Sequence, residues 1–205
     1  WDLGETRFDW AALRQFVASD VDRLERAYTN TLDSNKVEHF HERATVAGPN
    51  TVRLASGREI SAKHILVAVG AWPVMPESDG GEHCITSNEV FHLPELPRRI
   101  VIQGAGYIAL EFAGVFNALG SQVTVVNRSD KILRGYDHDL TDRLLPIMQA
   151  RGIVFGFNRP IRKVEKAVDG SLLVHAGEGE PIATDAVMVA TGRRPKTDGL
   201  GLESA

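Results

Sequence analysis

A glycine-rich turn between a short apolar strand and a helix is the feature that most constrains the fold of this chain. Residues 99–103 are mostly apolar, and Gly104–Ala109 follows with the sequence Gly-Ala-Gly-Tyr-Ile-Ala. A helical pattern then runs from Tyr107 to Leu119 and closes at Gly120, before a second apolar strand over 122–127. This order matches the G-x-G-x-x-G/A turn of a dinucleotide-binding βαβ unit. We therefore predict an α/β fold built on a Rossmann-like βαβ unit.

Each small residue of this turn has a predicted role. Gly104 permits the tight turn, Gly106 lets the backbone approach a pyrophosphate, and Ala109 allows close packing of helix and strand. The start of the helix adds free N–H groups and the positive end of its dipole. The alternative interpretation is a glycine turn that binds no ligand.

The end of the second strand indicates which dinucleotide is preferred. An acidic residue there binds the ribose hydroxyls of NAD or FAD, but this chain has Asn127 and Arg128, with Arg134 six residues later. Guanidinium groups bind a 2′-phosphate well, and a carboxylate would repel it. Two such contacts favour NADPH over NADH by a factor on the order of a hundred. The alternative is that both arginines are solvated surface charges.

Other segments also show regular patterns. Apolar residues at helical spacing predict a helix over 9–32, capped by Asp9 or Thr6. Strands are expected over 51–54 and over 62–69, the second ending at Gly70. The remaining expected elements are a helix over 140–151, a strand over 153–157, and turn-rich antiparallel strands over 164–192, the last of them buried over 186–190.

Two segments of the chain resemble one another. Residues 62–70 and 184–192 each follow a polar hairpin, end in glycine, and lead to a proline three residues later. This echo indicates two related nucleotide-binding domains. The glycine-rich turn of the first would precede residue 1, so the chain is expected to begin inside that domain. A coincidental echo is the alternative.

Composition narrows the classes of function. A net charge of −4 argues against a nucleic-acid partner, and the apolar runs are too short to span a membrane. No signal peptide is visible, and one cysteine cannot build a disulfide framework, so a cytoplasmic location is expected. The single cysteine, Cys84, is interpreted as a small, partly buried residue rather than a nucleophile. His39 and His41, on one face of an expected strand, are interpreted as surface residues rather than metal ligands, because no third ligand stands out.

Taken together, these motifs resemble a known family. The segment Gly104–Gly114, the residue Arg128 and the segment Lys131–Asp137 are similar to those of the glutathione reductases, a branch of the pyridine nucleotide–disulfide oxidoreductases. The resemblance extends from Gly4 to Pro195. It implies NADPH and FAD as cofactors and glutathione disulfide as substrate. It also implies a homodimer with no nucleic-acid or membrane partner.

The resemblance assigns roles to residues of the NADPH half. Arg128 and Arg134 match the pair that holds the 2′-phosphate. Tyr107 matches the tyrosine that covers the nicotinamide pocket, with Ile108 beside it. Glu111 matches a glutamate that pairs with a lysine at the flavin; that lysine lies upstream in the family and is not in this chain. Tyr107 and Glu111 are thus the catalytic candidates. Gly192 matches a backbone contact to NADPH.

Other matching positions belong to the flavin and substrate sites. Gly70, Ser87 and Arg193 match positions near FAD, and Tyr28 matches a tyrosine of the glutathione site. The chain departs from the pattern at Val69, where the family usually has threonine. It also lacks an FAD glycine turn, a C-x4-C pair and a C-terminal interface domain. We therefore expect these 205 residues alone to be inactive as a disulfide reductase.

The expected organisation follows from this resemblance. Residues 1–72 are a partial FAD-binding domain, and 73–196 are an NADPH-binding domain with a parallel sheet and an antiparallel β-meander. Residues 197–205 begin the return to the FAD domain. Two functional alternatives stay open: another NADPH-dependent member of the family, such as trypanothione reductase, and a non-catalytic NADPH-binding module. Dihydrolipoamide dehydrogenase is disfavoured, because Asn127 and Arg128 replace its acidic residue.

Overall fold

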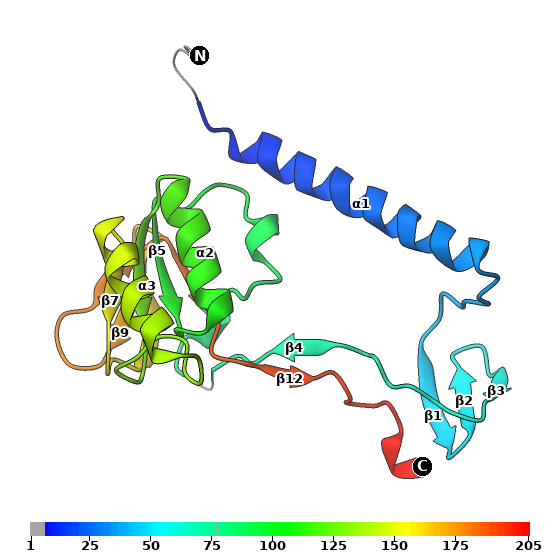
Figure 1. The fold of residues 1–205 in the computed structure, drawn as a ribbon. Helices are drawn as coiled ribbons and strands as arrows, with labels where there is room; N and C mark the ends of the chain where they lie inside the picture. Colours follow the sequence, from blue (N-terminus) through cyan, green and yellow to red (C-terminus); the bar gives the residue numbers. More distant parts are fainter. Residues whose placement is uncertain (1–6, 77) are drawn as a thin grey trace. The chain divides into compact units, whose positions relative to one another are not determined.

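The computed structural model describes residues 7–76 and 78–205 of the chain (Figure 1). It divides into two compact units. The first comprises the chain up to Val17 together with Pro73–Gly192, and the second comprises Ala18–Trp72 together with Arg193–Ala205. Thr6 and the start of the matching segment at Gly4 lie outside the described residues.

A four-stranded parallel sheet forms the centre of the first unit. Its strands, in the order β11-β5-β6-β7, are β5 (Arg99–Gln103), β6 (Gln122–Val126), β7 (Val154–Gly156) and β11 (Ala186–Val189). All three pairings are parallel, with Ile100 opposite both Val123 and Ala186. The strands and the parallel sheet predicted from the apolar runs are confirmed, with ends that differ by one residue or none.

Two helices accompany this sheet. The helix α2 (Tyr107–Ala118) ends at Leu119 and Gly120, as predicted. The helix α3 (His138–Ala150) begins two residues before the predicted start at Leu140. The reason is a cap: the Asp137 carboxylate accepts a hydrogen bond of 2.8 Å from the backbone N–H of Asp139. A side-chain cap satisfies an amide that would otherwise lack a partner.

An antiparallel meander packs on the other face of the sheet. It consists of β8 (Ile161–Lys166), β9 (Leu172–Ala176) and β10 (Ile182–Thr184), paired in the order β10-β9-β8. The side chains of β5 alternate between the two faces of the sheet. Ile100 and Ile102 belong to the core between the sheet and the helices, whereas Val101 belongs to the core between the sheet and the meander. Successive residues of a strand point to opposite faces, so one short strand serves both cores. The predicted meander is confirmed.

The segment before β5 is tied to the sheet by main-chain bonds. It contains two short 3-10 helices, η1 (Gly81–His83) and η2 (Val90–His92). Between them, the N–H of Ile85 donates to the Val187 carbonyl, and the N–H of Val189 donates to the Ile85 carbonyl. These bonds add a bridge beside β11 and hold the segment in place.

The helix α1 (Trp10–Ser34) contributes its first turns to the first unit. Asp9 caps it, because its carboxylate accepts a hydrogen bond of 3.1 Å from the N–H of Ala12. Trp10 is buried against Phe116 and donates its indole N–H to the Leu93 carbonyl at 2.9 Å. The helix predicted over 9–32 is confirmed and extends two residues further.

The second unit consists of small elements. Antiparallel strands β1 (Ala44–Gly48), β2 (Thr51–Leu54) and β3 (Glu59–Ser61) form one sheet. The strands β4 (Ala71–Pro73) and β12 (Arg193–Pro195) form a second and run side by side in Figure 1. The 3-10 helix η3 (Leu202–Ser204) follows near the C-terminus. None of the described helices is long and apolar enough to cross a membrane.

Two strand predictions are wrong. Residues 62–69 form no strand, and Leu66 is 89% exposed. A strand needs a neighbour for its N–H and C=O groups, and the structure places no strand of the described chain beside this segment; instead the Asn50 amide donates to the carbonyls of Ala62 and Lys63. The segment with His39 and His41 also forms no strand. There the His39 ring bonds the carboxylate of Asp33, at the end of α1, at 3.0 Å.

Candidate functional site

The glycine turn lies where β5 ends, at the carboxyl edge of the parallel sheet. Gly104 has a φ of +114°, which side chains with a Cβ rarely adopt. A Cβ at this position would lie 2.4 Å from the carbonyl oxygen of Ala190, at the end of β11. The N–H of Gly104 donates to the Val126 carbonyl at 2.9 Å. Only glycine therefore allows the ends of β5, β6 and β11 to approach so closely.

Gly106 has a different surrounding. It precedes α2 with an extended backbone, and no side chain caps the start of this helix. A Cβ at Gly106 would meet nothing within 4 Å, so the space beside its backbone is open. Ala109, one turn later, is fully buried. The first turn of α2 thus sits tightly on the sheet, with amide groups available to a ligand.

The loop after β6 lies against this turn. The Asn127 amide donates to the Ser129 hydroxyl and to the Lys131 carbonyl, both at 2.9 Å. Leu133, with a φ of +48°, donates its N–H to the Ala105 carbonyl at 2.7 Å. These bonds fix a loop that carries the two predicted arginines.

Both of these arginines, Arg128 and Arg134, are exposed. Arg128 immediately follows the anchor residue Asn127, and Arg134 immediately follows Leu133, whose N–H bonds the glycine turn. Within the part of the chain that the structure describes, neither guanidinium has a hydrogen bond or ion pair. Both charges are therefore available beside the turn, as an anion-binding arrangement requires.

The next predicted residues lie on α2 itself. Tyr107 is its first residue and is 53% exposed, and Glu111 follows one turn later, also exposed. Ile108 is half-buried and packs on the helix-side core. Among the described residues no cation pairs with Glu111. Tyr107 and Glu111 thus share one exposed face of the helix at i, i+4 spacing.

Gly192 lies at the same edge of the sheet. The N–H of Ala190 donates to the Gln103 carbonyl at 2.8 Å, which joins the ends of β11 and β5. Two residues later, the carbonyl of Gly192 accepts a hydrogen bond of 3.0 Å from Val74. The structure therefore brings Gly192 to the strand ends around Gly104.

Gly70 and Arg193 come together in the second unit. The Arg193 guanidinium donates to the Ala71 carbonyl at 2.6 Å, and the N–H of Lys196 donates to the Gly70 carbonyl at 2.9 Å. The Lys196 ammonium lies 4.3 Å from the centre of the Trp72 ring. This pairing of β4 with β12 is not visible in the sequence, because its strands are more than a hundred residues apart.

The other two predicted positions, Ser87 and Tyr28, have no hydrogen bond or ion pair to these residues within the described part of the chain. Ser87 lies in the first unit, on the turn closed by bonds from the backbone N–H and hydroxyl of Thr86 to the Glu89 carboxylate, at 2.7 and 2.6 Å. Tyr28 lies on the part of α1 that belongs to the second unit and is 73% exposed.

Sequence reasoning missed the support of the arginine loop. The sequence indicates only that Asn127 replaces an acidic residue, whereas in the structure its amide shapes the loop. Asparagine and serine are both common in turns, so Asn127 and Ser129 directly after the strand could have indicated a shaped loop. No pattern in the sequence indicates the positive φ of Leu133.

Two ionisable side chains outside the glycine turn, Cys84 and Glu165, also have shifted pKa values. Cys84 is half-buried, and burial, aided by the nearby charge of Glu82, raises the pKa of its thiol to about 11. A thiol with such a pKa is a poor nucleophile at neutral pH. Glu165 bonds Lys163 and His175 across the meander. No group of three or more potential metal ligands occurs in residues 7–76 and 78–205.

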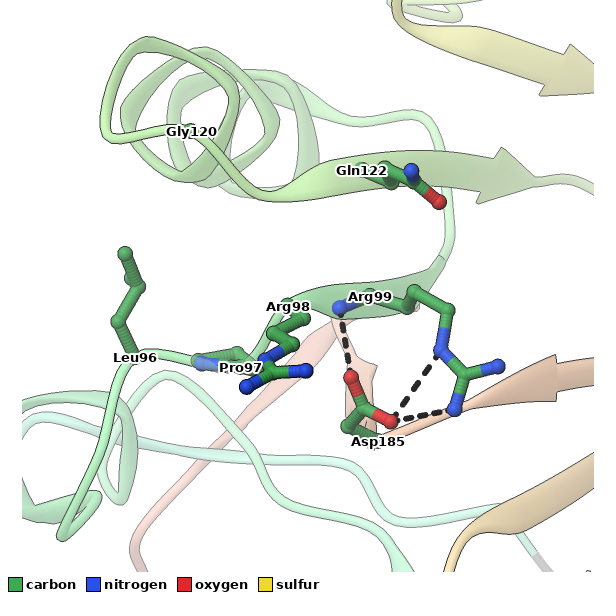
Figure 2. A pocket seen from close by; sticks show the side chains of 7 residues that line it. All are labelled: Leu96, Pro97, Arg98, Arg99, Gly120, Gln122 and Asp185. Atoms are coloured by element: carbon green, nitrogen blue, oxygen red, sulfur yellow. Dashed lines mark hydrogen bonds and ion pairs between the residues drawn. The ribbon is translucent and has the colours of Figure 1, made fainter.

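A pocket of about 500 Å³ lies at the opposite, amino edge of the sheet (Figure 2). Two of its residues are joined: Asp185 accepts hydrogen bonds from the backbone and guanidinium of Arg99, the backbone bond being 2.8 Å. These bonds, led by the guanidinium, lower the pKa of Asp185. Ligands of parallel α/β sheets bind at the carboxyl edge, so we assign the candidate site to the glycine turn. The pocket is lined by Leu96, Pro97, Arg98, Arg99, Gly120, Gln122 and Asp185.

The chain is similar to reductases of known sequence. It is 40% identical over 206 residues to a glutathione reductase of Nostoc sp., and 42% identical over 204 residues to one of Burkholderia cepacia. Both matches cover 100% of this chain and 45% of the relative. A trypanothione reductase of Trypanosoma congolense is 35% identical over 216 residues, with 100% and 44% covered. The chain thus spans less than half the length of these relatives.

A solved structure and a family description agree with these matches. The HOCl-induced flavoprotein disulfide reductase RclA from Escherichia coli superposes with a TM-score of 0.86 at 27% identity, over 97% of this chain and 46% of that protein. Residues 4–205 match the family described as pyridine nucleotide-disulphide oxidoreductase. This chain therefore belongs to the pyridine nucleotide-disulphide oxidoreductase family.

Proposed function

We propose that this chain is the NADPH-binding part of an NADPH-dependent flavoprotein disulfide reductase whose substrate is glutathione disulfide. One observation carries the proposal: an open glycine turn at the carboxyl edge of the sheet is flanked by Arg128 and Arg134 on an anchored loop. The glutathione reductases of Nostoc and Burkholderia cepacia, which match along the whole chain, support it.

The residues at this edge fit a dinucleotide. The open space beside Gly106 and the uncapped start of α2 suit a pyrophosphate, which accepts hydrogen bonds from backbone amides. Arg128 and Arg134 suit a 2′-phosphate, because their guanidinium groups are unpaired among the described residues. When bound, NADPH supplies a hydride, and FAD supplies the redox chemistry that carries electrons to a disulfide.

Other residues orient the nicotinamide end under this proposal. Tyr107, exposed at the start of α2, would cover the nicotinamide ring, and Ile108 follows it in the chain and packs on the helix-side core. We assign Glu111, one turn further along α2, to the flavin-linked position that the family resemblance gives it. The backbone of Gly192, beside the end of β5, contacts NADPH. Their support is their common position at the edge that carries the glycine turn.

The flavin and domain assignments belong to the same proposal. Residues 1–72 and 197–205 contribute to an FAD-binding domain, and 73–196 form the NADPH-binding domain. Gly70 fits a flavin contact, since a Cβ there would meet nothing within 4 Å, and Arg193 is bonded beside it. Ser87 is the third position assigned near FAD.

The substrate assignment rests on fewer residues. Tyr28 and Arg26 are both exposed on α1, and we assign Tyr28 to the glutathione site. A cation such as Arg26 suits the anionic glutathione better than a positively charged disulfide. We further propose that the whole protein is a cytoplasmic homodimer. Trypanothione disulfide is the second candidate substrate, supported by the match to the trypanosomal enzyme.

Calorimetric titration with NADPH and NADH tests the cofactor assignment. Wild-type protein is expected to bind NADPH at least about tenfold more tightly. Arg128→Gln and Arg134→Gln should each remove about tenfold of the NADPH affinity and leave NADH binding unchanged. Arg98→Gln, at the opposite edge of the sheet (Figure 2), removes the same charge and should change neither affinity. Equal binding of NADH and NADPH by the wild type would contradict the assignment.

A second assay tests the reaction. The intact gene product is assayed with NADPH and either glutathione disulfide or trypanothione disulfide. Faster turnover of glutathione disulfide supports the proposal. Faster turnover of trypanothione disulfide would instead make trypanothione disulfide the assigned substrate. Tight NADPH binding without turnover of either disulfide would favour a non-catalytic NADPH-binding module.

A further inference from the structure

Arg159 follows the end of β7, and its side chain lies beside three glycines, Gly156, Gly177 and Gly179. A Cβ at Gly177 would approach its Cγ to 3.1 Å, and a Cβ at Gly156 would approach its Cδ to 3.2 Å. At Gly179 a Cβ would lie 3.7 Å from the Nη2 nitrogen. Larger residues at the first two positions would press on the arginine stem. Because these glycines have no side chains, the long side chain of Arg159 fits beside them.

The guanidinium is held at one nitrogen only. Its Nε donates a hydrogen bond of 2.9 Å to the Ala176 carbonyl at the end of β9. Within residues 7–76 and 78–205 it makes no other hydrogen bond and no ion pair. A guanidinium has five N–H donors, so the two Nη groups of Arg159 keep theirs available. A side chain that is already ordered loses less conformational entropy when it binds an anion.

The main chain places Arg159 beside the arginine loop. Its N–H donates to the Asn127 carbonyl at 2.8 Å, and the N–H of Asn158 donates to the Ser129 carbonyl at 3.1 Å. These two bonds bracket Arg128, which lies between Asn127 and Ser129. Arg159 therefore follows β7 at the same carboxyl edge of the sheet as the glycine turn.

We propose that Arg159 is a specificity-determining residue, a third guanidinium that favours the 2′-phosphate of NADPH. The inference rests on the proposed function, because it concerns the same cofactor site. It goes beyond the pair of arginines predicted from the sequence and assigns a role to a residue about thirty positions downstream of Arg128. Charge-assisted bonds to phosphate are the strong class of hydrogen bond, so removal of this group has a measurable effect.

Adenosine 2′,5′-bisphosphate and 5′-AMP isolate this contact, because they differ only in the 2′-phosphate. Titration calorimetry of Arg159→Gln is expected to show about a tenfold loss of affinity for the bisphosphate, with 5′-AMP affinity within about twofold of wild type. Arg159→Lys keeps the charge and should lose less. Arg151→Gln, after α3 at the amino edge, is the matched loss of charge and should change neither affinity.

The outcomes separate the two proposals. A wild type that prefers the bisphosphate, with a ratio of affinities unchanged in Arg159→Gln, overturns this inference and leaves the proposed function intact. An equal loss of both ligands in Arg159→Gln and Arg159→Lys, with a lowered melting temperature, makes Arg159 a structural residue only and also overturns it. A wild type without preference for the bisphosphate overturns the proposed NADPH site together with this inference.

Discussion

Gly104 and Gly106 are expected to respond in opposite ways to the same substitution. Gly104→Ala places a Cβ 2.4 Å from the Ala190 carbonyl oxygen, on a backbone with a φ of +114°. Gly106→Ala places a Cβ in open space, on a backbone with a φ of −78° that any residue adopts. The first substitution should destabilise the fold, and the second should mainly weaken nucleotide binding.

The magnitude at Gly104 has two parts. A left-handed backbone costs a residue with a Cβ roughly 1–2 kcal/mol, and forcing an extra carbon into a packed place costs roughly 1–3 kcal/mol. Because the obstructing atom is a backbone oxygen, neither part is relieved by a side-chain rotation. We expect the free energy of unfolding to fall by about 2–5 kcal/mol, a large share of the roughly 5–15 kcal/mol of a typical domain.

At Gly106 the changes in stability nearly cancel. Alanine is a poorer residue than glycine at the position before a helix. It also reduces the conformational freedom of the unfolded chain, which stabilises by roughly 0.4–1 kcal/mol. The net change should stay within about 0.5 kcal/mol, whereas NADPH affinity should fall by about tenfold or more, since the methyl group fills the space proposed for the pyrophosphate.

Urea denaturation followed by far-UV circular dichroism measures the first effect, and calorimetric titration with NADPH measures the second. The reasoning is refuted if Gly104→Ala unfolds at the same urea concentration as the wild type. It is also refuted if Gly106→Ala is destabilised as much as Gly104→Ala, because the two positions would then share one role.

Three further substitutions or reactions probe other parts of the first unit. The thiol of Cys84, with a pKa of about 11, is about 0.1% thiolate at pH 8. Iodoacetamide should therefore alkylate it about a hundredfold more slowly than a free cysteine of pKa about 8.5. A rate equal to that of a small thiol would show that the group is not buried. Asp185→Asn removes the carboxylate that Arg99 bonds and should cost about 1 kcal/mol in urea denaturation at pH 7. Because the Arg99 bonds lower the pKa of Asp185, its stabilisation is present above the ordinary aspartate pKa and is lost as the pH falls through the lower folded value, and this acid dependence should be weaker in the variant. Asn127→Ala removes two anchors of the arginine loop and should weaken NADPH binding about tenfold with little change in melting temperature, whereas unchanged affinity would show that the loop holds its shape without them.

The elements around the glycine turn could be predicted because their signals are local. The apolar run of β5, the turn beginning at Gly104 and the helical period of α2 adjoin one another in the chain. The pairing of β4 with β12 could not be predicted in this way, because its partners are brought together only by the fold. Strand β1 was likewise missed, since Ala44–Gly48 is short and has no clear alternation.

The two similar segments show why an apolar run alone does not make a strand. Residues 186–189 pair in parallel with β5 and are buried, so their N–H and C=O groups are satisfied. Residues 62–69 have a similar apolar pattern, yet no strand of the described chain lies beside them and most of their side chains are exposed. The apolar pattern indicates which side chains can be buried. A neighbouring strand is also needed, because it supplies the hydrogen-bond partners without which the backbone cannot be buried.

The candidate site likewise contains residues with local sequence signals and contacts that only the fold creates. The glycine motif, with Arg128 and Arg134, could be proposed from the sequence, because the residues that such a motif requires adjoin one another in the chain. The bonds that hold their loop could not. Leu133 reaches the Ala105 carbonyl through a backbone conformation that no pattern indicates, and Arg159 reaches Asn127 because β7 pairs with β6.

Net charge illustrates how a global property can mislead about a local site. The chain carries a net charge of −4, which argues against a polyanion such as nucleic acid. A dinucleotide phosphate responds to charges within about one Debye length, roughly 8–10 Å at physiological ionic strength. At the carboxyl edge the nearest loop offers Arg128 and Arg134, with the neutral Asn127 where an acidic residue would stand for NAD. An acidic protein can therefore present a local group of cations, and under the proposed function those few residues, rather than the composition, set the preference between NADH and NADPH.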